Sequence, residues 1–210
     1  MRMNNKLLYF LIFLLPYCAW AQTREMTANE RASFQKSLQK LVEIKTISAD
    51  FVQYKHLSFM KKPVESSGKL YLEHPDKLSW AYTAPFQYKM VFKDSKIFID
   101  DQGKKQTIDI GNNKQFEKIS TLVSSSMRGG QYDEKEFAVS YLKRGEADMV
   151  RLTPKLAGAK KYIKEIVLLF SPANKYVEEV KLVEPSNDYT RFVIKNRKVN
   201  ATIDDSIFNL

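Results

Sequence analysis

The side chains that could perform catalysis or bind a metal ion are few in this sequence, and their spacing suits neither task. The two histidines, His56 and His74, have no histidine or carboxylate around them at metal-ligand spacing. Adjacent acids occur at Asp100-Asp101 and Asp204-Asp205, but neighbouring strand residues point to opposite faces and make poor acid–base pairs. Glycine-rich phosphate loops and nucleophile elbows are missing as well. We therefore expect no enzymatic activity, no metal site and no cofactor.

The first residues have the composition of an export signal. Arg2 and Lys6 precede an apolar run over residues 7–15, and the small-x-small sequence Ala19-Trp20-Ala21 follows. The run is roughly half of the ~20 apolar residues that cross a membrane. We expect residues 1–21 to be a cleavable signal peptide, Gln22 to begin the mature chain, and the protein to be located in the periplasm. Cys18 leaves a lipoprotein signal, acylated at that cysteine, as an alternative.

The mature chain expected over residues 22–210 is basic and has no cysteine. Disulfides and thiolate chemistry are therefore excluded from it. No linker or change of composition divides this segment, so we expect a single domain. The formal net charge of the whole sequence is +10, and two of the basic residues belong to the signal. For an exported protein this charge favours lipid head groups or acidic envelope proteins as partners over nucleic acid, and a solvated lysine-rich surface is the alternative.

Two helices are expected where apolar residues recur with a period of about 3.6. Thr27 and Glu30 have the spacing of a capping box, and a helix should run from there to about Lys45. Its apolar stripe consists of Phe34, Leu38, Leu41 and Val42. A second helix should end at Gly129-Gly130. Its stripe consists of Phe116, Ile119, Leu122, Val123 and Met127.

The rest of the chain alternates between apolar and polar residues in short segments separated by turn residues. Alternation with a period of two predicts strands, and short connections make sequential strands antiparallel. We expect about eleven strands in an antiparallel sheet that curls toward a barrel. The expected strands are 47–51, 68–72, 78–82, 88–92, 96–100, 106–110, 137–142, 149–153, 162–170, 177–184 and 189–195.

Large apolar side chains are concentrated on one face of three of these strands. The segment from Gly68 to Phe92 contains a His-Pro-Asp turn, and the residues on both sides of it alternate. The apolar positions are Leu70, Leu72, Leu78, Trp80, Tyr82, Tyr88, Met90 and Phe92. Such a face must be covered, either by the protein's own helices as an ordinary core or by an apolar ligand.

Three sequence motifs occur along the chain in a defined order and spacing. The first is Ala49-x-Phe51-x-Gln53, after the first helix. The second is Gly68-x-Leu70 followed by Pro75, Leu78 and Trp80. The third is Leu152-Thr153-Pro154-Lys155. Each motif alone is weak, but together with the export signal they resemble the LolA family of periplasmic lipoprotein carriers over nearly all of the mature sequence.

The resemblance implies an incomplete antiparallel β-barrel with a helical lid over an apolar cavity. The eight apolar positions from Leu70 to Phe92 would form the cavity wall, and Phe116, Ile119, Leu122 and Met127 would form the lid. The implied cargo is the acyl chains of triacylated lipoproteins. The implied partners are an inner-membrane ABC transporter that releases them and an outer-membrane acceptor that receives them. A monomer that binds no nucleic acid is expected.

His74 departs from the pattern of the family, which commonly has an arginine before this proline, bonded to carbonyl groups of the lid. Histidine offers fewer donors than arginine. If His74 is the lid latch, closure is expected to be weaker or sensitive to pH, or to rest on other residues.

Other functions remain open on the same fold, because a fold alone does not determine a function. The protein could be a periplasmic carrier of another lipid or glycolipid, or a sensor of lipoproteins. It could be a lipidated outer-membrane acceptor if Cys18 is acylated. A periplasmic hydrolase would need a polar cluster at the mouth of the cavity.

Overall fold

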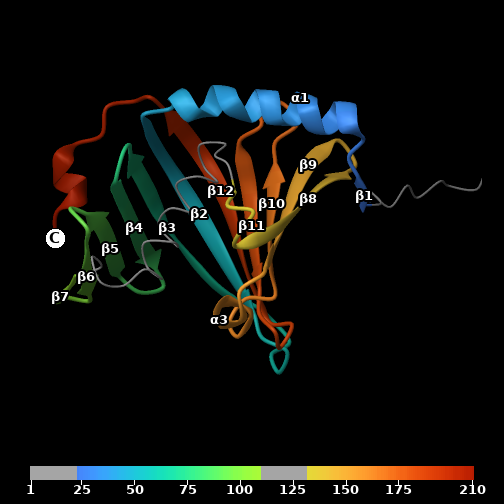
Figure 1. Ribbon diagram of the computed structural model, residues 1–210. Helices are drawn as coiled ribbons and strands as arrows, with labels where there is room; N and C mark the ends of the chain where they lie inside the picture. Colours follow the sequence, from blue (N-terminus) through green and yellow to red (C-terminus); the bar gives the residue numbers. More distant parts are fainter. Residues whose placement is uncertain (1–22, 110–131) are drawn as a thin grey trace, which may run out of the picture.

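The computed structural model describes residues 23–109 and 132–210 (Figure 1). The expected signal peptide lies outside the described residues. So does the expected second helix, with the four lid positions Phe116, Ile119, Leu122 and Met127.

Most of the described chain belongs to one sheet of twelve strands. The strands are β1 (Thr23–Glu25), β2 (Thr46–His56), β3 (Val64–Glu73), β4 (Lys77–Ala84), β5 (Tyr88–Lys93), β6 (Lys96–Asp101), β7 (Lys104–Asp109), β8 (Phe137–Arg144), β9 (Ala147–Pro154), β10 (Glu165–Phe170), β11 (Val177–Val183) and β12 (Tyr189–Val199). Their order in the sheet is β1-β8-β9-β10-β11-β12-β2-β3-β4-β5-β6-β7.

The sheet is antiparallel at every pairing and open at β1 and β7. It bends strongly, and helix α1 (Ala28–Gln39) lies across the ends of the strands at the top of Figure 1. The prediction of a mainly β fold with an incomplete antiparallel barrel is confirmed. The cavity and the lid remain predictions.

The eleven expected strands correspond to β2 through β12, and β1 was not predicted. β1 has only three residues, and their pairing with Arg144, Lys143 and Leu142 of β8 places them in the sheet. No alternation can be recognised over so short a segment. The strand expected over 162–170 begins later, at Glu165. A short helix, α3 (Ala157–Lys160), precedes it, and the chain ends in a 3₁₀ helix, η2 (Asp205–Phe208).

Helix α1 begins as the capping box predicts. The Thr27 hydroxyl accepts a hydrogen bond from the backbone N–H of Glu30, whose carboxylate accepts one from the backbone N–H of Thr27. The α-helix ends earlier than expected and continues as the 3₁₀ helix η1 (Lys40–Glu43). Because a 3₁₀ helix has three residues per turn, the apolar stripe is interrupted there, so Leu41 is buried and Val42 is 50% exposed.

Two-residue turns set the register of β5, β6 and β7. Asp94 and Ser95 connect β5 to β6 with φ values of 52° and 55°, and Gln102 and Gly103 connect β6 to β7 with values of 53° and 90°. Positive φ at both central residues gives the tight hairpin turn whose twist matches that of the strands. Alternate side chains of the three strands therefore share a face, as the sequence predicts.

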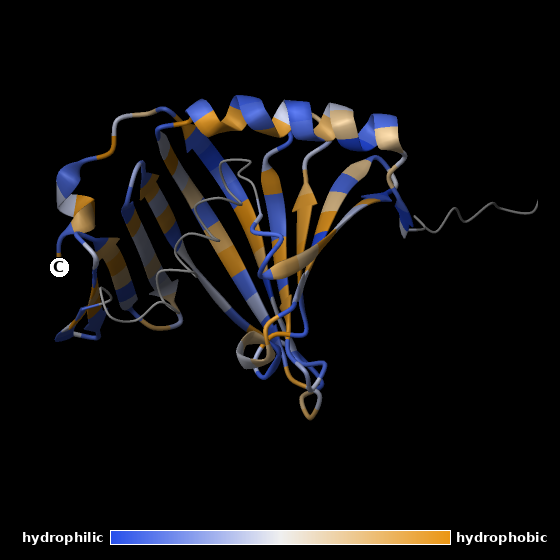
Figure 2. Ribbon diagram, viewed as in Figure 1, coloured by the Kyte–Doolittle hydropathy of each residue, from blue (hydrophilic) through white to orange (hydrophobic). Residues whose placement is uncertain are grey.

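The main core lies between α1 and the face of the sheet that α1 covers, which we call the inner face. Phe34 and Leu38 of α1 are buried there, and the Phe34 ring meets the Phe170 ring of β10 edge-to-face at 5.0 Å. Apolar and polar residues alternate along the strands in Figure 2, so the inner face is apolar while the outer face is largely polar.

Candidate functional site

Strand pairing brings the eight predicted wall residues together in three rows that cross the inner face. The first row consists of Ile47, Leu72, Leu78, Phe92 and Ile97. The second consists of Ala49, Leu70, Trp80, Met90 and Ile99. The third consists of Phe51, Gly68, Tyr82, Tyr88 and Asp101. The predicted residues are thus neighbours on one surface rather than scattered positions.

Burial divides these eight residues into two groups. Four of them are fully buried in the core cluster: Leu70, Leu72, Leu78 and Phe92. The other four are half-buried and pack against that core: Trp80, Tyr82, Tyr88 and Met90. The first row, next to η1, is solid core, and burial decreases toward the third row. The half-buried group is therefore the part of the inner face that a ligand could contact.

An aromatic cluster surrounds Trp80 on the inner face of β4. The Phe51 ring lies 4.9 Å from the Trp80 ring and 5.1 Å from the Tyr82 ring. The Phe192 ring of β12 meets Trp80 edge-to-face at 5.2 Å. These separations are typical of favourable aromatic pairs and give the inner face a large apolar surface of defined shape.

Tyr82 carries the polar group of this cluster. Its hydroxyl donates a hydrogen bond of 2.7 Å to Oε1 of Gln53 on β2. Burial raises the pKa of Tyr82 above its ordinary value, so the phenol stays neutral. Burial likewise raises the pKa of the neighbouring Tyr88, with the charge of Asp101 as the smaller cause. The half-buried surface is therefore uncharged at its two tyrosines.

Gly68 makes the close approach of β3 and β4 possible at the third row. A Cβ atom there would lie 2.0 Å from the carbonyl oxygen of Ala81 and 2.8 Å from the ring of Phe51. The register shifts between Ser67 and Gly68, so the strands bend at this point. Glycine thus allows Phe51 and Tyr82 to lie on either side of it in one row.

Three residues of this cluster were not among the predicted site residues: Phe51, Gln53 and Phe192. The alternation of Phe192 and Ile194 within β12 was the signal that could have found one of them. Which strand pairs with β2 could not be derived from that alternation, because β12 is distant in the sequence.

His74 lies in the turn between β3 and β4. Its backbone N–H donates a hydrogen bond of 2.8 Å to the carbonyl oxygen of Lys45, and the residue is exposed. The turn is thereby fastened to the segment that joins η1 to β2. The lid residues that a latch would contact lie outside the described residues.

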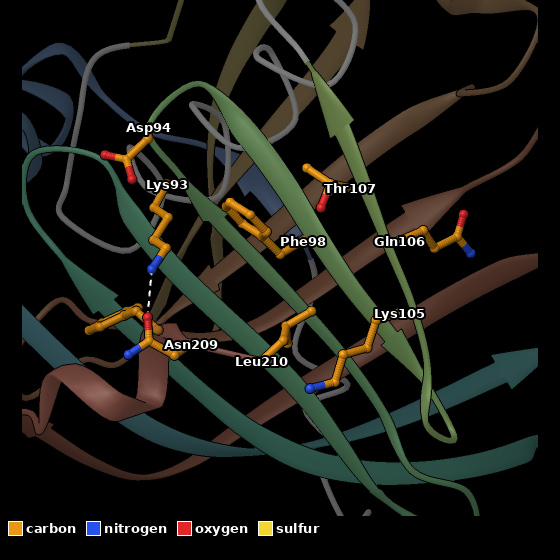
Figure 3. Close-up of a pocket in the computed structure, with 9 residues that line it drawn as sticks. Lys93, Asp94, Phe98, Lys105, Gln106, Thr107, Asn209 and Leu210 are labelled. Carbon is orange, nitrogen blue, oxygen red and sulfur yellow. Dashed lines mark hydrogen bonds between the residues drawn. The ribbon is translucent and has the colours of Figure 1, made fainter.

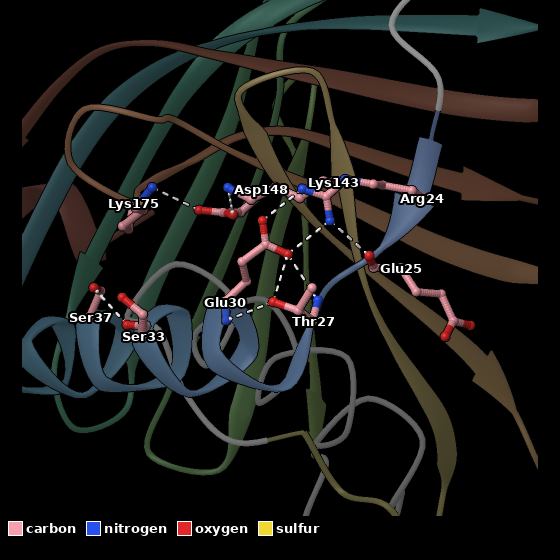
Figure 4. A network of polar contacts seen from close by, with 9 residues as sticks. All are labelled: Arg24, Glu25, Thr27, Glu30, Ser33, Ser37, Lys143, Asp148 and Lys175. Carbon is pink, nitrogen blue, oxygen red and sulfur yellow. Dashed lines mark hydrogen bonds and ion pairs between the residues drawn. The ribbon is translucent and has the colours of Figure 1, made fainter.

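A charged network occupies the inner face near the start of α1 (Figure 4). The buried carboxylate of Asp148 lies 2.6 Å from the ammonium group of Lys143 and 2.7 Å from that of Lys175. The two lysines adjoin a hollow of about 310 Å³ that is also lined by Glu30 and Phe34 of α1. This network joins the β8–β9 hairpin to the β10–β11 turn. Because its groups are charged, it is not part of the apolar surface around Trp80.

A second hollow, of about 620 Å³, lies where the C-terminal residues cross the outer face of β5 to β7 (Figure 3). Nζ of Lys93 donates to Oδ1 of Asn209 at 2.7 Å, and Nζ of Lys89 donates to the Asn209 carbonyl oxygen at 2.6 Å. Partial burial lowers the pKa of Lys89. These contacts fasten the C-terminal segment to the back of the sheet, on the side away from Trp80.

Within residues 23–109 and 132–210, no three histidine, cysteine or acidic side chains are placed to hold a metal ion. No helix in the same part of the chain is long and apolar enough to span a membrane.

Comparisons with known proteins place the chain in a family. The family model described as "Outer membrane lipoprotein carrier protein LolA" matches residues 42–210. An outer-membrane lipoprotein carrier protein of Chromobacterium violaceum is 24% identical over 185 residues, covering 87% of this chain and 85% of the relative. One of Methylococcus capsulatus is 21% identical over 199 residues, covering 94% of this chain and 90% of the relative.

Among solved structures, an uncharacterized conserved protein of Thermus thermophilus shares the fold with a TM-score of 0.52. It is 8% identical, and the match covers 86% of this chain and 93% of that one. The family model spans most of the sequence, including the motifs around Phe51, Trp80 and Pro154. The resemblance inferred from those motifs is confirmed, and the chain belongs to the LolA family of outer membrane lipoprotein carrier proteins.

Proposed function

We propose that this protein is a periplasmic carrier that shields the acyl chains of lipoproteins and takes them from the inner to the outer membrane. The cargo would be triacylated lipoproteins. An inner-membrane ABC transporter would release them to the carrier, and an outer-membrane acceptor would receive them. Membership of the LolA family and the names of both curated relatives support carriage, and we propose no catalytic activity.

The physical need for such a carrier follows from the cost of exposing acyl chains to water. Each methylene contributes about 0.8 kcal/mol, so a single acyl chain costs roughly 10 kcal/mol to hold in water. A lipoprotein with three chains cannot cross an aqueous compartment unshielded. The carrier must therefore offer an apolar surface that is accessible to the cargo during loading and release and is shielded from water during transit.

The single observation that carries the proposal is the half-buried part of the inner face. Trp80, Tyr82, Tyr88 and Met90 are adjacent on β4 and β5, beside the fully buried row on the same face. Four large side chains that are half-exposed side by side on one face of a sheet form the kind of contiguous apolar patch that marks a binding site. Aromatic rings and methionine suit acyl chains because they cover a large area and adapt in shape.

The lid and its latch are part of the same proposal. Phe116, Ile119, Leu122 and Met127 would close over the bound chains as the apolar stripe of one helix. His74 would hold the closed lid from the β3–β4 turn. The hydrogen bond between its backbone and Lys45 gives that turn a fixed position.

The position of Trp80 allows a direct test. The sequence has two tryptophans, Trp20 and Trp80. Cleavage after Ala21 leaves Trp80 as the one tryptophan of residues 22–210. An acyl chain brominated along its length quenches tryptophan only in close contact. Titrating the mature protein with a brominated fatty acid should quench the Trp80 fluorescence, whereas the same acid without bromine should not.

Two variants on one strand give the matched control. Trp80→Glu, on the inner face, should fold yet lose binding of a radiolabelled fatty acid, because a carboxylate is poorly tolerated beside an acyl chain. Thr83→Glu introduces the same charge at an exposed position on the outer face of β4 and should bind like the wild type. Saturable binding of the brominated acid without quenching would place the site away from Trp80 and refute the proposal.

A further inference from the structure

Exposed apolar side chains gather at the end of the sheet that is opposite α1. Five of the seven large apolar side chains that are exposed in the described part of the chain lie there. They are Phe59 (80% exposed), Met60, Val64, Leu156 and Tyr162 (68% exposed), and we call them the tip surface. The first three belong to the β2–β3 loop and the start of β3, and the other two flank helix α3.

Hydrogen bonds to one turn bring these two segments to the same place. The backbone N–H of Ser58, next to Phe59, donates to Oδ1 of Asp188 in the β11–β12 turn at 2.7 Å. Nζ of Lys164, which follows α3, donates to Oδ1 of Asn187 in that same turn at 2.6 Å. The β11–β12 turn thus bridges the two segments, and all three connections converge at the bottom of Figure 1.

Lysines lie next to the apolar side chains of the tip surface in the sequence. Residues 57–63 contain Lys61 and Lys62 and no acid. Residues 155–164 contain four lysines and no acid. Acidic residues also lie at this end: Glu65 on β3, Glu184 and Asp188 in the bridging turn, Glu165 at the start of β10, and Asp133, Glu134 and Glu136 before β8, where the carbonyl oxygens of Glu134 and Glu136 contact Lys155. The carboxylate of Asp188 accepts the hydrogen bond from Ser58, and that of Glu165 pairs with Arg151. Exposed lysines near Phe59 and Tyr162 in the sequence include Lys61, Lys62, Lys160 and Lys161, and the two segments that carry them contain no acid.

This combination fits a lipid surface better than a protein. The cores of protein–protein interfaces are depleted of lysine, whereas lysines here are interleaved with the apolar groups. A second copy of the chain would bring one basic surface against another and be repelled. At a membrane, by contrast, large apolar side chains enter the interfacial layer while lysines extend toward anionic head groups.

We propose that the tip surface docks the protein on a membrane that contains anionic lipid. Phe59 and Tyr162 insert between the head groups, and Lys61, Lys62, Lys160 and Lys161 supply the electrostatic attraction. The proposal is independent of acyl carriage, because it involves the opposite end of the strands from α1 and requires no cargo.

Flotation of the purified mature protein with lipid vesicles tests this docking. Vesicles of phosphatidylcholine with added phosphatidylglycerol should bind the protein, high salt should weaken the binding, and vesicles of phosphatidylcholine alone should bind little. Phe59→Glu should lower the partition coefficient at least about tenfold, since it removes the burial of one large side chain and adds repulsion. Replacing Lys61 and Lys62 with glutamine should lower it about fivefold for each lysine.

Val42→Glu is the matched control. It adds the same charge at a 50% exposed apolar position of η1, at the other end of the strands, and should leave flotation unchanged. Phe59→Trp should retain binding because tryptophan suits the interface equally well. Binding of the brominated fatty acid by Phe59→Glu should equal that of the wild type, which separates docking from carriage.

Three results would overturn the proposal. The first is equal flotation of Phe59→Glu and wild type, and the second is binding that is indifferent to anionic lipid. The third is a dimer in solution that Phe59→Glu converts to a monomer, with no binding to vesicles, because the tip surface would then be an interface between copies of the chain.

Discussion

At the scale of single residues, Gly68 has no room for a side chain. The carbonyl oxygen of Ala81 lies 2.0 Å from the place where a Cβ atom would be built, and that oxygen belongs to the backbone of the neighbouring strand. A flexible side chain could move aside, but a paired strand cannot move without breaking its hydrogen bonds. The row that contains Phe51 and Tyr82 therefore depends on glycine at this position.

Gly68→Ala is expected to lower the free energy of unfolding by about 3 kcal/mol or more, the upper range for overpacked positions. Gly158→Ala is the control, because a Cβ atom there meets nothing within 4 Å. Since Gly158 lies within α3, its replacement should leave stability unchanged or raise it by up to about 1 kcal/mol. Urea denaturation of both variants measures the difference, and equal stabilities would show that β3 and β4 are not constrained at Gly68.

At the scale of elements, α1 is fastened at its beginning by Arg24 of β1. The guanidinium group donates two hydrogen bonds, of 2.7 and 2.8 Å, to the two carboxylate oxygens of Glu30. That hydrogen bonding is the largest cause that lowers the pKa of Glu30 from 4.5 to about 2, and the backbone N–H of Thr27 adds to it. The ion pair thus links the edge strand β1 to the helix that covers the core.

This pair should make part of the stability dependent on pH. Because folding lowers the pKa of Glu30, its contribution is complete above pH 4.5 and is lost as the pH falls toward 2. The difference in unfolding free energy between wild type and Glu30→Gln should therefore be constant near neutral pH and shrink below pH 4.5. Arg24→Gln should behave alike, and the double variant should add little to either. A difference that persists unchanged down to pH 2 would contradict this account of α1.

Local sequence patterns predict which residues of sequential strands share a face, but they do not predict contacts between distant segments. The alternation from Gly68 to Phe92 predicted that its apolar residues share one face, because β3, β4 and β5 are sequential and joined by short turns, so their register follows from the chain itself. Phe192 joins the same cluster through the pairing of β12 with β2, which no local pattern encodes. Lys175 contacts Asp148 from a turn between two strands, so neither the helical nor the strand periodicity of the sequence predicts this contact.

At the scale of the whole molecule, the described surfaces differ in chemistry. The inner face is apolar apart from the charged network at Asp148, with α1 over one end of the strands and the half-buried group around Trp80 beyond it. The outer face is largely polar, and its lysines hold the C-terminal segment. The end opposite α1 is both basic and apolar. This distribution of surfaces suits a protein that binds acyl chains on its inner face and docks on a membrane through the end opposite α1.

The most direct test of carriage is to identify what the protein holds in the cell. The mature protein is purified from the periplasm without detergent, and the bound material is analysed by mass spectrometry. We predict a triacylated lipoprotein, present with the wild type and lost from Trp80→Glu while Thr83→Glu retains it. A folded protein that carries only phospholipid or glycolipid, or no acyl chain at all, would contradict the central claim.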